Sequence, residues 1–523
     1  MDDIHRALEP LDYIVIAAYV TVLITIGMWV SIRRRGAEDL FLAGRSLGWP
    51  NVGLSIFGTN ISPAFLISVC GVAYSSGMVS ANFEWLAWWF LMLLAMLFVP
   101  YYINTKISTM PQFMKLRFGQ PTHTFLSWYA LFTTILLWLG GSLYAGGVLL
   151  SQIMNWPLWT SVLTLTVVAT SFTVAGGLAA VVITDSFQSV LMIVGAASLT
   201  VIGLVEVGGV AALVDGAPAD YWTLIRPADD AVYPWPAMFL GYPVLATWFW
   251  CTDQTIVQRV LGAKDLRHGQ LGAVFAGFLK ILPPFIFMLP GILCFVLHPG
   301  LKDPDTAFMT MVTNHLPVGM VGLIVAVLIA AVISTVDSGL NSFSTVFTLD
   351  IYTRMFRPQA TTREIKSVGR AATIVAAAIA VGCALAMETL ARGMFDLLNG
   401  IIAFIAPPMT AVFVIGVLWK RATAKAAIST LVVGSIVSLS VGVFHFKAEQ
   451  GTLPHYLLLS FYLFAGIATF MVVVSLLTRN SPTEVNLPLL KETYAEQGTH
   501  PKFVWCLWGV LALIMLGIYV VFN

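Results

Sequence analysis

Long apolar runs alternate with short polar segments along almost the whole chain. About fourteen of these runs reach roughly 20 residues, the length that a helix needs to cross the hydrocarbon core of a bilayer. No Pro- or Ser-rich linker divides them, so we expect one all-α, polytopic membrane domain over residues 1–523. The expected spans are 11–32, 48–77, 81–104, 124–154, 158–183, 185–210, 236–258, 270–296, 318–349, 369–390, 394–419, 424–446, 455–477 and 503–522.

Composition and charge narrow the class of protein. Of the 523 residues 58% are hydrophobic and only 10% are charged, and the mean hydropathy is +0.87, values far from those of a soluble domain. The net charge of +1 gives no reason to expect a nucleic-acid partner. The five cysteines are scattered and odd in number, so no disulfide framework is predicted. The expected partner that surrounds the chain is the lipid bilayer.

The distribution of Lys and Arg predicts the orientation. The first span, 11–32, ends in the three arginines of 33–35 rather than in a cleavage site for a signal peptide, so we expect it to remain. If these arginines are cytoplasmic, most of the 27 Lys and Arg residues fall in inward segments such as 105–123, 259–269 and 350–370. We therefore expect a plasma-membrane protein (inner membrane in a bacterium) with both termini outside the cytoplasm.

The second span carries a break. Its stretch GTNISPAFL, residues 58–66, contains weak helix formers, and Pro63 has no N–H to donate to the carbonyl of Thr59. Lipid offers no partner for the freed backbone groups, so protein, water or a bound ligand must satisfy them. Gly241 and Pro243 disturb the seventh span in a similar way. Broken spans five apart predict a transporter of two inverted five-helix repeats, whereas ordinary kinks are the alternative.

Four charged residues lie in or at the ends of apolar spans, where an unpaired charge costs about 2.5–3.5 kcal/mol or more. They are Glu84, Asp185, Lys280 and Asp337. Such residues normally face a cavity or a partner. For Glu84 and Lys280 the simpler interpretation is a structural ion pair or an interface anchor, and for Asp185 it is a helix cap.

The ninth span adds a row of oxygen atoms. Ala331, Ser334 and Thr335 are spaced so that they share one helix face. Neutral oxygen ligands suit a hard, monovalent cation. Alone, small hydroxyl residues more often serve close helix packing. Together with two carbonyls from the 58–62 break, they predict a cation site of about five oxygens.

Several stretches resemble the sodium/solute symporters, with the nearest likeness to the sodium–glucose cotransporter branch. They are GTNIS, NFEW, GGLAAVVITDSFQ, WFWCTDQTIVQRVLGAKD, GFLK, NSFSTVFTLDIY and APPMTAVFVIGVLWKR. The resemblance extends from about residue 11 to 446 and implies a LeuT-type core of ten helices. Its expected parts are an extra N-terminal helix at 11–32, a first repeat at 48–210, a second repeat at 236–419 and three peripheral helices at 424–522.

The resemblance also implies two cation sites. The family's main sodium site falls on the carbonyls of Gly58, Ile61 and Ala331 and the hydroxyls of Ser334 and Thr335, which agrees with the site predicted from the pattern. A second cation site, found in some members, falls on Asp185, Ser334, Asp337 and Ser338. The family usually has Ser or Thr at position 337, so Asp337 is an additional carboxylate. We therefore expect a second coupled ion.

Sugar contacts of the sugar-carrying members fall on polar residues of four different spans, beside gate aromatics. The polar residues are Asn60, Glu84, Lys280 and Asn399, and the gate residues are Phe65, Phe83, Trp248, Phe249 and Trp250. Three positions depart from the sugar transporters: Phe65 and Ala246 replace polar residues, and Asn399 replaces a Gln. The predicted cavity therefore resembles the sugar site of these transporters but does not reproduce it.

These features predict a sodium-coupled symporter for a small polar solute, with a monosaccharide or related polyol as the first choice. A symporter for an organic anion such as a sialic acid, with Lys280 as the counter-charge, is the alternative. A multi-pass membrane enzyme or a sensor is more remote, because the chain has neither an H-E-x-x-H nor a G-x-x-x-x-G-K motif. Sodium is the expected coupling ion, and no organic cofactor is expected.

Overall fold

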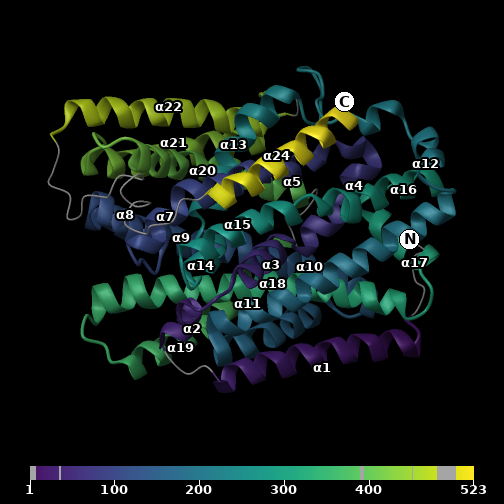
Figure 1. Ribbon diagram of the computed structural model, residues 1–523, viewed down its shortest axis with the longest axis horizontal. Helices are drawn as coiled ribbons and strands as arrows, with labels where there is room; N and C mark the ends of the chain where they lie inside the picture. The colour runs from purple at the N-terminus through teal and green to yellow at the C-terminus, as the bar shows by residue number, and fades with distance from the viewer. Residues whose placement is uncertain (1–7, 34–36, 389–393, 450–451, 480–501) are drawn as a thin grey trace.

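The chain folds into a bundle of long helices that run roughly side by side (Figure 1). The computed structural model describes residues 8–33, 37–388, 394–449, 452–479 and 502–523, and these ranges contain no β-strand. The helices of the first part are α1 (Pro10–Arg33), α2 (Ala37–Leu42), α3 (Trp49–Asn60), α4 (Pro63–Ser76), α5 (Asn82–Trp85), α6 (Ala87–Leu93), α7 (Val99–Asn104), α8 (Met110–Phe118), α9 (Gln120–Thr133), α10 (Ser142–Met154), α11 (Leu158–Val207) and α12 (Val210–Gly216). Those of the second part are α13 (Tyr242–Thr247), α14 (Gln254–Leu261), α15 (Leu266–Leu279), α16 (Leu289–Leu297), α17 (Ala307–His315), α18 (Met320–Val346), α19 (Thr362–Met387), α20 (Met394–Leu418), α21 (Ala424–Lys447), α22 (Tyr456–Leu477) and α24 (Lys502–Val521).

Eleven helical segments of the described chain are long and apolar enough to cross a membrane. The predicted count of about fourteen spans is not confirmed, because several expected spans are interrupted or joined. The expected span 48–77 consists of α3, which has only 12 residues, and α4. The expected span 236–258 consists of short helical pieces that include α13 and α14. Irregular backbone therefore occurs inside apolar segments, where protein or a ligand must cover it.

Two of the expected spans, 158–183 and 185–210, lie in α11, which consists of two helices that meet at a kink. Its 50 residues bend at Gly177, whose φ of +58° belongs to the left-handed region that favours glycine. A Cβ atom at Gly177 would clash with the carbonyl oxygen of Leu40, so the close packing of α2 also requires glycine here. The interpretation of Asp185 as a helix cap is wrong, because this residue lies inside α11, well beyond the bend.

The seventh expected span is interrupted at a different place from the one predicted. Near Gly241 and Pro243 the chain forms a π-helical turn, Ala237–Gly241, that continues directly into α13. Pro243 accounts for the wide turn, because it cannot donate a hydrogen bond to the preceding turn. The helix stops only at Asp253, whose ψ of 130° is extended. The Asp253 carboxylate accepts the N–H of Thr255 at 2.8 Å and so begins α14.

The centre of the bundle is α18, which contains the predicted row of oxygen atoms. The apolar segment that begins with α18, Met320–Phe356, is the most buried of the eleven, since 83% of an apolar stretch of 18 residues in it lies inside the protein. Helix α18 packs against α1, α11 and α19, and it also contacts α3, α4 and α14. The start of α1 and the end of α24 lie at the same end of the bundle (Figure 1). The prediction that this end is extracytoplasmic stays a prediction.

Candidate transport site

The predicted break in the second span is confirmed at residues 61–62. The last helical residue of α3 is Asn60, Ile61 is extended with ψ of 93°, and Ser62 begins α4 by accepting the N–H of Phe65 at 3.1 Å. The carbonyl of Thr59, which Pro63 cannot satisfy, accepts a hydrogen bond from the hydroxyl of Thr335 at 3.3 Å. The Thr59 carbonyl, which has no helical donor because of Pro63, is therefore hydrogen-bonded by a side chain of α18.

The residues of the predicted main sodium site gather around this contact. Thr335 also lies 3.0 Å from the carbonyl of Ala331, one turn earlier in α18. A Cβ atom added to Gly58 would lie 3.3 Å from Oγ of Ser334, so α3 approaches α18 closely here. Ile61 is fully buried at the break itself. The donor set consists of carbonyl and hydroxyl oxygens, which fit a hard, monovalent cation.

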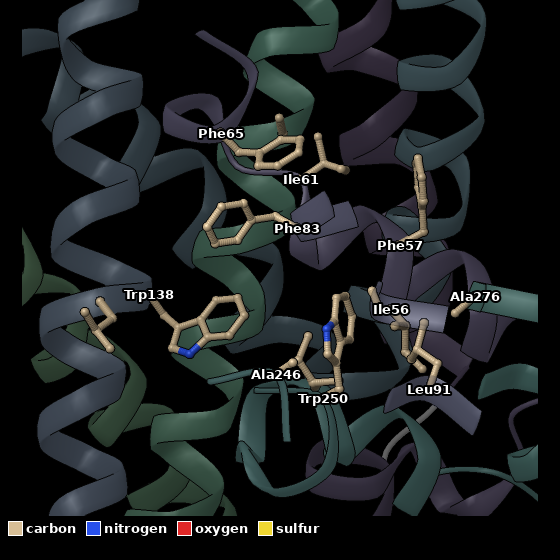
Figure 2. Close-up of a cluster of buried hydrophobic side chains, with 14 of the residues drawn as sticks. Ile56, Phe57, Ile61, Phe65, Phe83, Leu91, Trp138, Ala246, Trp250 and Ala276 are labelled. Atoms are coloured by element: carbon tan, nitrogen blue, oxygen red, sulfur yellow. The ribbon is translucent and has the colours of Figure 1, made fainter. Parts of the chain in front are cut away.

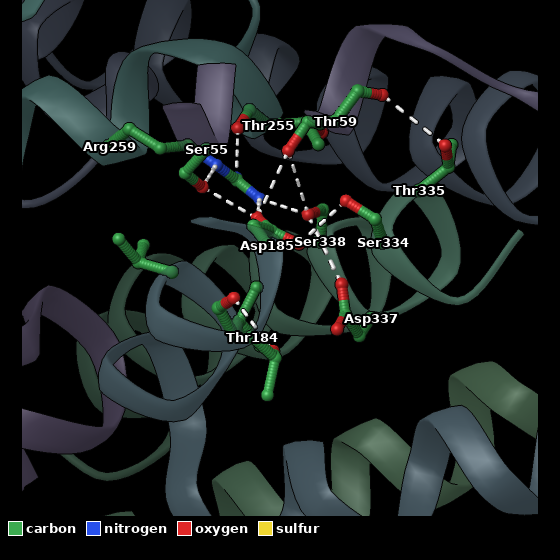
Figure 3. Close-up of polar contacts among 12 residues, drawn as sticks. Ser55, Thr59, Thr184, Asp185, Thr255, Arg259, Ser334, Thr335, Asp337 and Ser338 are labelled. Atoms are coloured by element: carbon green, nitrogen blue, oxygen red, sulfur yellow. Dashed lines mark hydrogen bonds and ion pairs between the residues drawn. The ribbon is translucent and has the colours of Figure 1, made fainter. Parts of the chain in front are cut away.

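The second predicted cation site forms a larger polar cluster beside the first (Figure 3). Asp185 of α11 accepts hydrogen bonds from the hydroxyls of Ser55 and Ser334, both at 2.6 Å. The hydroxyl of Thr59 lies 3.1 Å from that of Ser338 and 3.4 Å from the Asp185 carboxylate. Ser334, which is predicted for both cation sites, therefore contacts Asp185 of the second one.

Arg259 of α14 belongs to the same cluster, although the sequence analysis placed it in an inward-facing segment. The Arg259 side chain is completely buried inside the protein. Its guanidinium lies 3.4 Å from the Asp185 carboxylate and 3.2 Å from Oγ of Ser55. It also donates to Oγ of Ser338 and to the carbonyl of Thr255. Arg259 ends an apolar stretch, a position typical of a surface anchor, so only the fold reveals its role.

Asp337 is also completely buried, and its two carboxylate oxygens differ in their environments. The hydroxyl of Ser338 lies 3.3 Å from Oδ1 of Asp337. Within the described part of the chain, Oδ2 has no hydrogen-bond partner. A buried carboxylate oxygen without a partner is costly. Asp337 is therefore the least satisfied charge in this cluster.

Three of the four predicted substrate residues lie together on another side of the break. Lys280, at the end of α15, donates to Oδ1 of Asn60 and to the Glu84 carboxylate. Its ammonium group also lies 4.9 Å from the ring centroid of Trp250, as in a cation–π contact. The side chains of Glu84 and Lys280 are almost completely buried. The interpretation of these two residues as an ion pair is confirmed.

Two adjoining cavities lie beside this ion pair. One has an empty volume of about 710 Å³ and the other of about 500 Å³, both including the open solvent at their mouths. Five residues line both: Asn60, Phe65, Phe249, Asn399 and Ile402. The fourth predicted substrate residue, Asn399, therefore reaches the same space as Asn60.

The predicted gate aromatics surround these cavities. Trp248 lines the larger cavity, whereas Phe83, Glu84 and Trp250 line the smaller one. Thr59 and Thr335 also line the larger cavity, so it reaches the predicted sodium site.

Other residues that line the cavities, such as Trp138, Ser142 and Tyr242, were not predicted from the sequence. Figure 2 shows Trp138 facing Trp250 from the opposite side, with Phe65 and Phe83 above them. The ring of Trp138 stacks on that of Phe249 with a centroid distance of 5.3 Å. A Trp in an apolar run carries no signal that distinguishes a cavity wall from ordinary packing.

Comparisons with known proteins identify relatives of this chain and solved structures that resemble it. The chain is 34% identical to sodium/glucose cotransporter 4 of Danio rerio over 91% of its own length and 80% of that protein. It is 33% identical to sodium/myo-inositol cotransporter 2 of Oryctolagus cuniculus over 83% and 70% of the two chains. A solved sodium-coupled sialic acid symporter in an outward-open state matches with a TM-score of 0.80 at 22% identity, over 91% of this chain and 99% of that one.

A second solved structure, a nucleobase–cation symporter in a closed conformation, matches with a TM-score of 0.52 at 15% identity, over 87% and 98% of the two chains. At these identities the two solved structures show a shared fold. The sequence model of the sodium:solute symporter family matches residues 40–434. With a family match over most of its length and relatives above 30% identity, the chain belongs to the sodium:solute symporter family.

Proposed function

We propose that this protein is a sodium-coupled symporter that imports a monosaccharide or a related polyol. One observation carries the proposal: Thr335, a predicted sodium ligand, and Thr59 beside it line the same cavity as Asn60 and Asn399. An ion and a solute that share one wall can each change the binding of the other. Among the curated relatives, several are named for glucose or myo-inositol.

We assign the main sodium ion to the carbonyls of Gly58, Ile61 and Ala331 and the hydroxyls of Ser334 and Thr335. The Thr335 hydroxyl of α18 already donates to the carbonyl of Thr59 in α3, and Ser334 of α18 lies close to Gly58. A sodium ion bound there links the broken helix to α18. It thereby favours the conformation in which the two are close, and a transported solute then selects the closed state.

The substrate site consists of the polar groups of Asn60, Glu84 and Asn399, backed by Lys280. The buried pair of Glu84 and Lys280 brings no net charge to the cavity wall, which suits a neutral solute. Hydroxyl groups can donate to the carboxylate and accept from the amides. The rings of Phe249 and the other gate aromatics offer flat faces for the C–H side of a sugar.

The conformational cycle follows from the expected repeats. We infer that residues 48–210 and 236–419 are inverted five-helix repeats of the LeuT type, with 11–32 before them and 424–522 beside them. The break after α3 and the stop at Asp253 then lie in corresponding spans of the two repeats. Alternating access exposes the shared cavity first to one side of the membrane and then to the other.

A sialic acid or another organic anion is the second candidate. A solved sialic acid symporter shares the fold, and Lys280 offers a positive charge. That charge is already balanced by Glu84, however, so an anion would have to displace a buried carboxylate. The observed pairing therefore favours the neutral solute.

The test is uptake into proteoliposomes of purified protein, with labelled hexoses, pentoses, inositols and sialic acid offered with and without an inward sodium gradient. We expect sodium-dependent uptake of a neutral polyhydroxylated solute, and deoxy analogues should compete poorly because they leave buried polar groups unpaired. Uptake of sialic acid alone would replace the sugar assignment by the anion. Uptake that ignores the sodium gradient would refute coupling.

A further inference from the structure

Three titratable side chains that the transport site does not use meet at the end of the bundle where α1 begins. They are Glu206 near the end of α11, His298 directly after α16 and His315 at the end of α17. Figure 1 shows α17 at this end of the bundle. The side chains of His315 and Glu206 are 13% and 38% exposed, and His298 is also only partly buried, so a dissolved ion can reach all three.

The two imidazoles face each other through the same kind of atom. Nε2 of His298 lies 2.7 Å from Nε2 of His315. On the other side of its ring, His315 contacts the Glu206 carboxylate through Nδ1. An ionised carboxylate only accepts hydrogen bonds, so Nδ1 of a neutral His315 carries the hydrogen. Nε2 of His315 therefore presents a lone pair to His298.

A lone pair that faces a second ring nitrogen needs a positive centre between the two atoms. A hydrogen on Nε2 of His298 is one solution. If His298 carries its hydrogen on Nδ1 instead, two lone pairs point at one place and can bind a metal ion. Neutral imidazole nitrogens suit Zn²⁺, Cu²⁺ and Ni²⁺. A carboxylate behind the ring, like Glu206, is typical of histidines that bind metals, because it fixes the tautomer and raises the basicity of the ligand.

The geometry requires little change to hold such an ion. Zinc lies about 2.0–2.1 Å from each imidazole nitrogen, so a tetrahedral site separates two of them by about 3.3 Å, roughly 0.6 Å more than in this pair. Both histidines lie at the ends of their helices, where so small a shift disturbs little packing. The described residues contain no group of three metal-ligating side chains around one point, so water completes the coordination.

The two histidines stand at the two ends of a segment, 298–315, that rests on α4. The hydroxyl of Tyr74 in α4 donates to the carbonyl of His298 at 3.0 Å and accepts the N–H of Leu301 at 2.8 Å. Helix α17 and the short turn Pro304–Thr306 also pack against α4. An ion between the histidines fastens the two ends of this segment together over α4, which is the half of the broken span that follows the break.

We propose that His298 and His315 form a binding site for a divalent transition-metal ion such as Zn²⁺, supported by Glu206, and that the bound ion restrains α4. None of these residues belongs to the predicted sodium or solute sites. Binding of the metal therefore does not depend on the proposed function. Its effect on transport does, because an ion that restrains half of the broken span should inhibit uptake.

Binding is tested by the melting temperature of the purified protein, freed of any histidine tag, in increasing zinc chloride. An ion that binds the folded state raises this temperature. We expect zinc to stabilise the wild type and magnesium to have no such effect, since magnesium prefers oxygen ligands. His298→Gln and His315→Gln should each remove the zinc response. Glu206→Gln should weaken the apparent affinity for zinc about tenfold or more, because it removes the partner that orients His315.

His268 provides the matched control. Its ring contacts the carboxylate of Asp265 at 2.9 Å, as that of His315 contacts Glu206, but within the described ranges no second histidine shares this contact. His268→Gln should keep the wild-type zinc response. An equal response in the wild type, His298→Gln and Glu206→Gln would overturn the site even if His315→Gln does not fold, and so would a wild type that zinc does not stabilise.

The restraint of α4 is tested by sodium-driven uptake in proteoliposomes with and without zinc. Zinc should inhibit the wild type and His268→Gln, whereas His298→Gln should be insensitive. Equal inhibition of His298→Gln, or no inhibition of a wild type that binds zinc, would overturn the restraint.

Discussion

The hydroxyl of Thr335 offers the most direct test of the main sodium site. It lies 3.0 Å from the carbonyl of Ala331 and 3.3 Å from that of Thr59, and the Thr335 side chain is 1% exposed. Thr335→Val keeps the shape of the side chain while removing its oxygen. The variant loses one of about five ligands and also leaves the carbonyl of Thr59 without its donor, because Pro63 has no N–H.

A ligand of this kind is worth about 1–3 kcal/mol, so the apparent affinity for sodium should fall roughly tenfold or more. The assay is the sodium dependence of solute uptake in proteoliposomes. Thr335→Ser, which keeps the hydroxyl, is the matched control and should stay close to the wild type. Wild-type sodium dependence in Thr335→Val would refute the assignment of this residue as a sodium ligand.

Three further expectations concern other parts of the molecule. Glu84→Gln should abolish uptake, because it leaves the buried Lys280 without its carboxylate. Removing one partner of a buried ion pair destabilises a protein by about 3–5 kcal/mol. Normal transport by this variant would exclude a role of Glu84 in binding. Burial lowers the pKa of His455 to about 4, below its ordinary value of about 6.5, so the folded protein should lose stability as pH falls through that interval. His455→Asn should reduce the loss, as measured by melting temperatures at pH 7 and pH 5. Gly177→Ala should lower the melting temperature more than Gly208→Ala, since both glycines have positive φ but only Gly177 lacks space for a Cβ atom; equal losses would contradict this.

Local chemistry was sufficient for some of the most specific features of this protein. The apolar runs determine a membrane protein, because no soluble fold can cover so much apolar surface. Pro63 favours the break after α3, because it has no N–H for the carbonyl of Thr59 and follows the weak helix formers of 58–60. The spacing of Ala331, Ser334 and Thr335 places them on one face of α18 by helix geometry alone.

Other features depend on pairs of residues far apart in the chain, which only the tertiary structure brings together. Arg259 becomes a buried partner of Asp185 because α14 packs against α18 and α3, and no local pattern marks it as buried. Lys280 meets Glu84 only because α15 packs against α6, which follows directly after the helix α5 that contains Glu84. A charged residue in an apolar span indicates from the sequence alone that a partner is needed. Which residue becomes that partner depends on the fold.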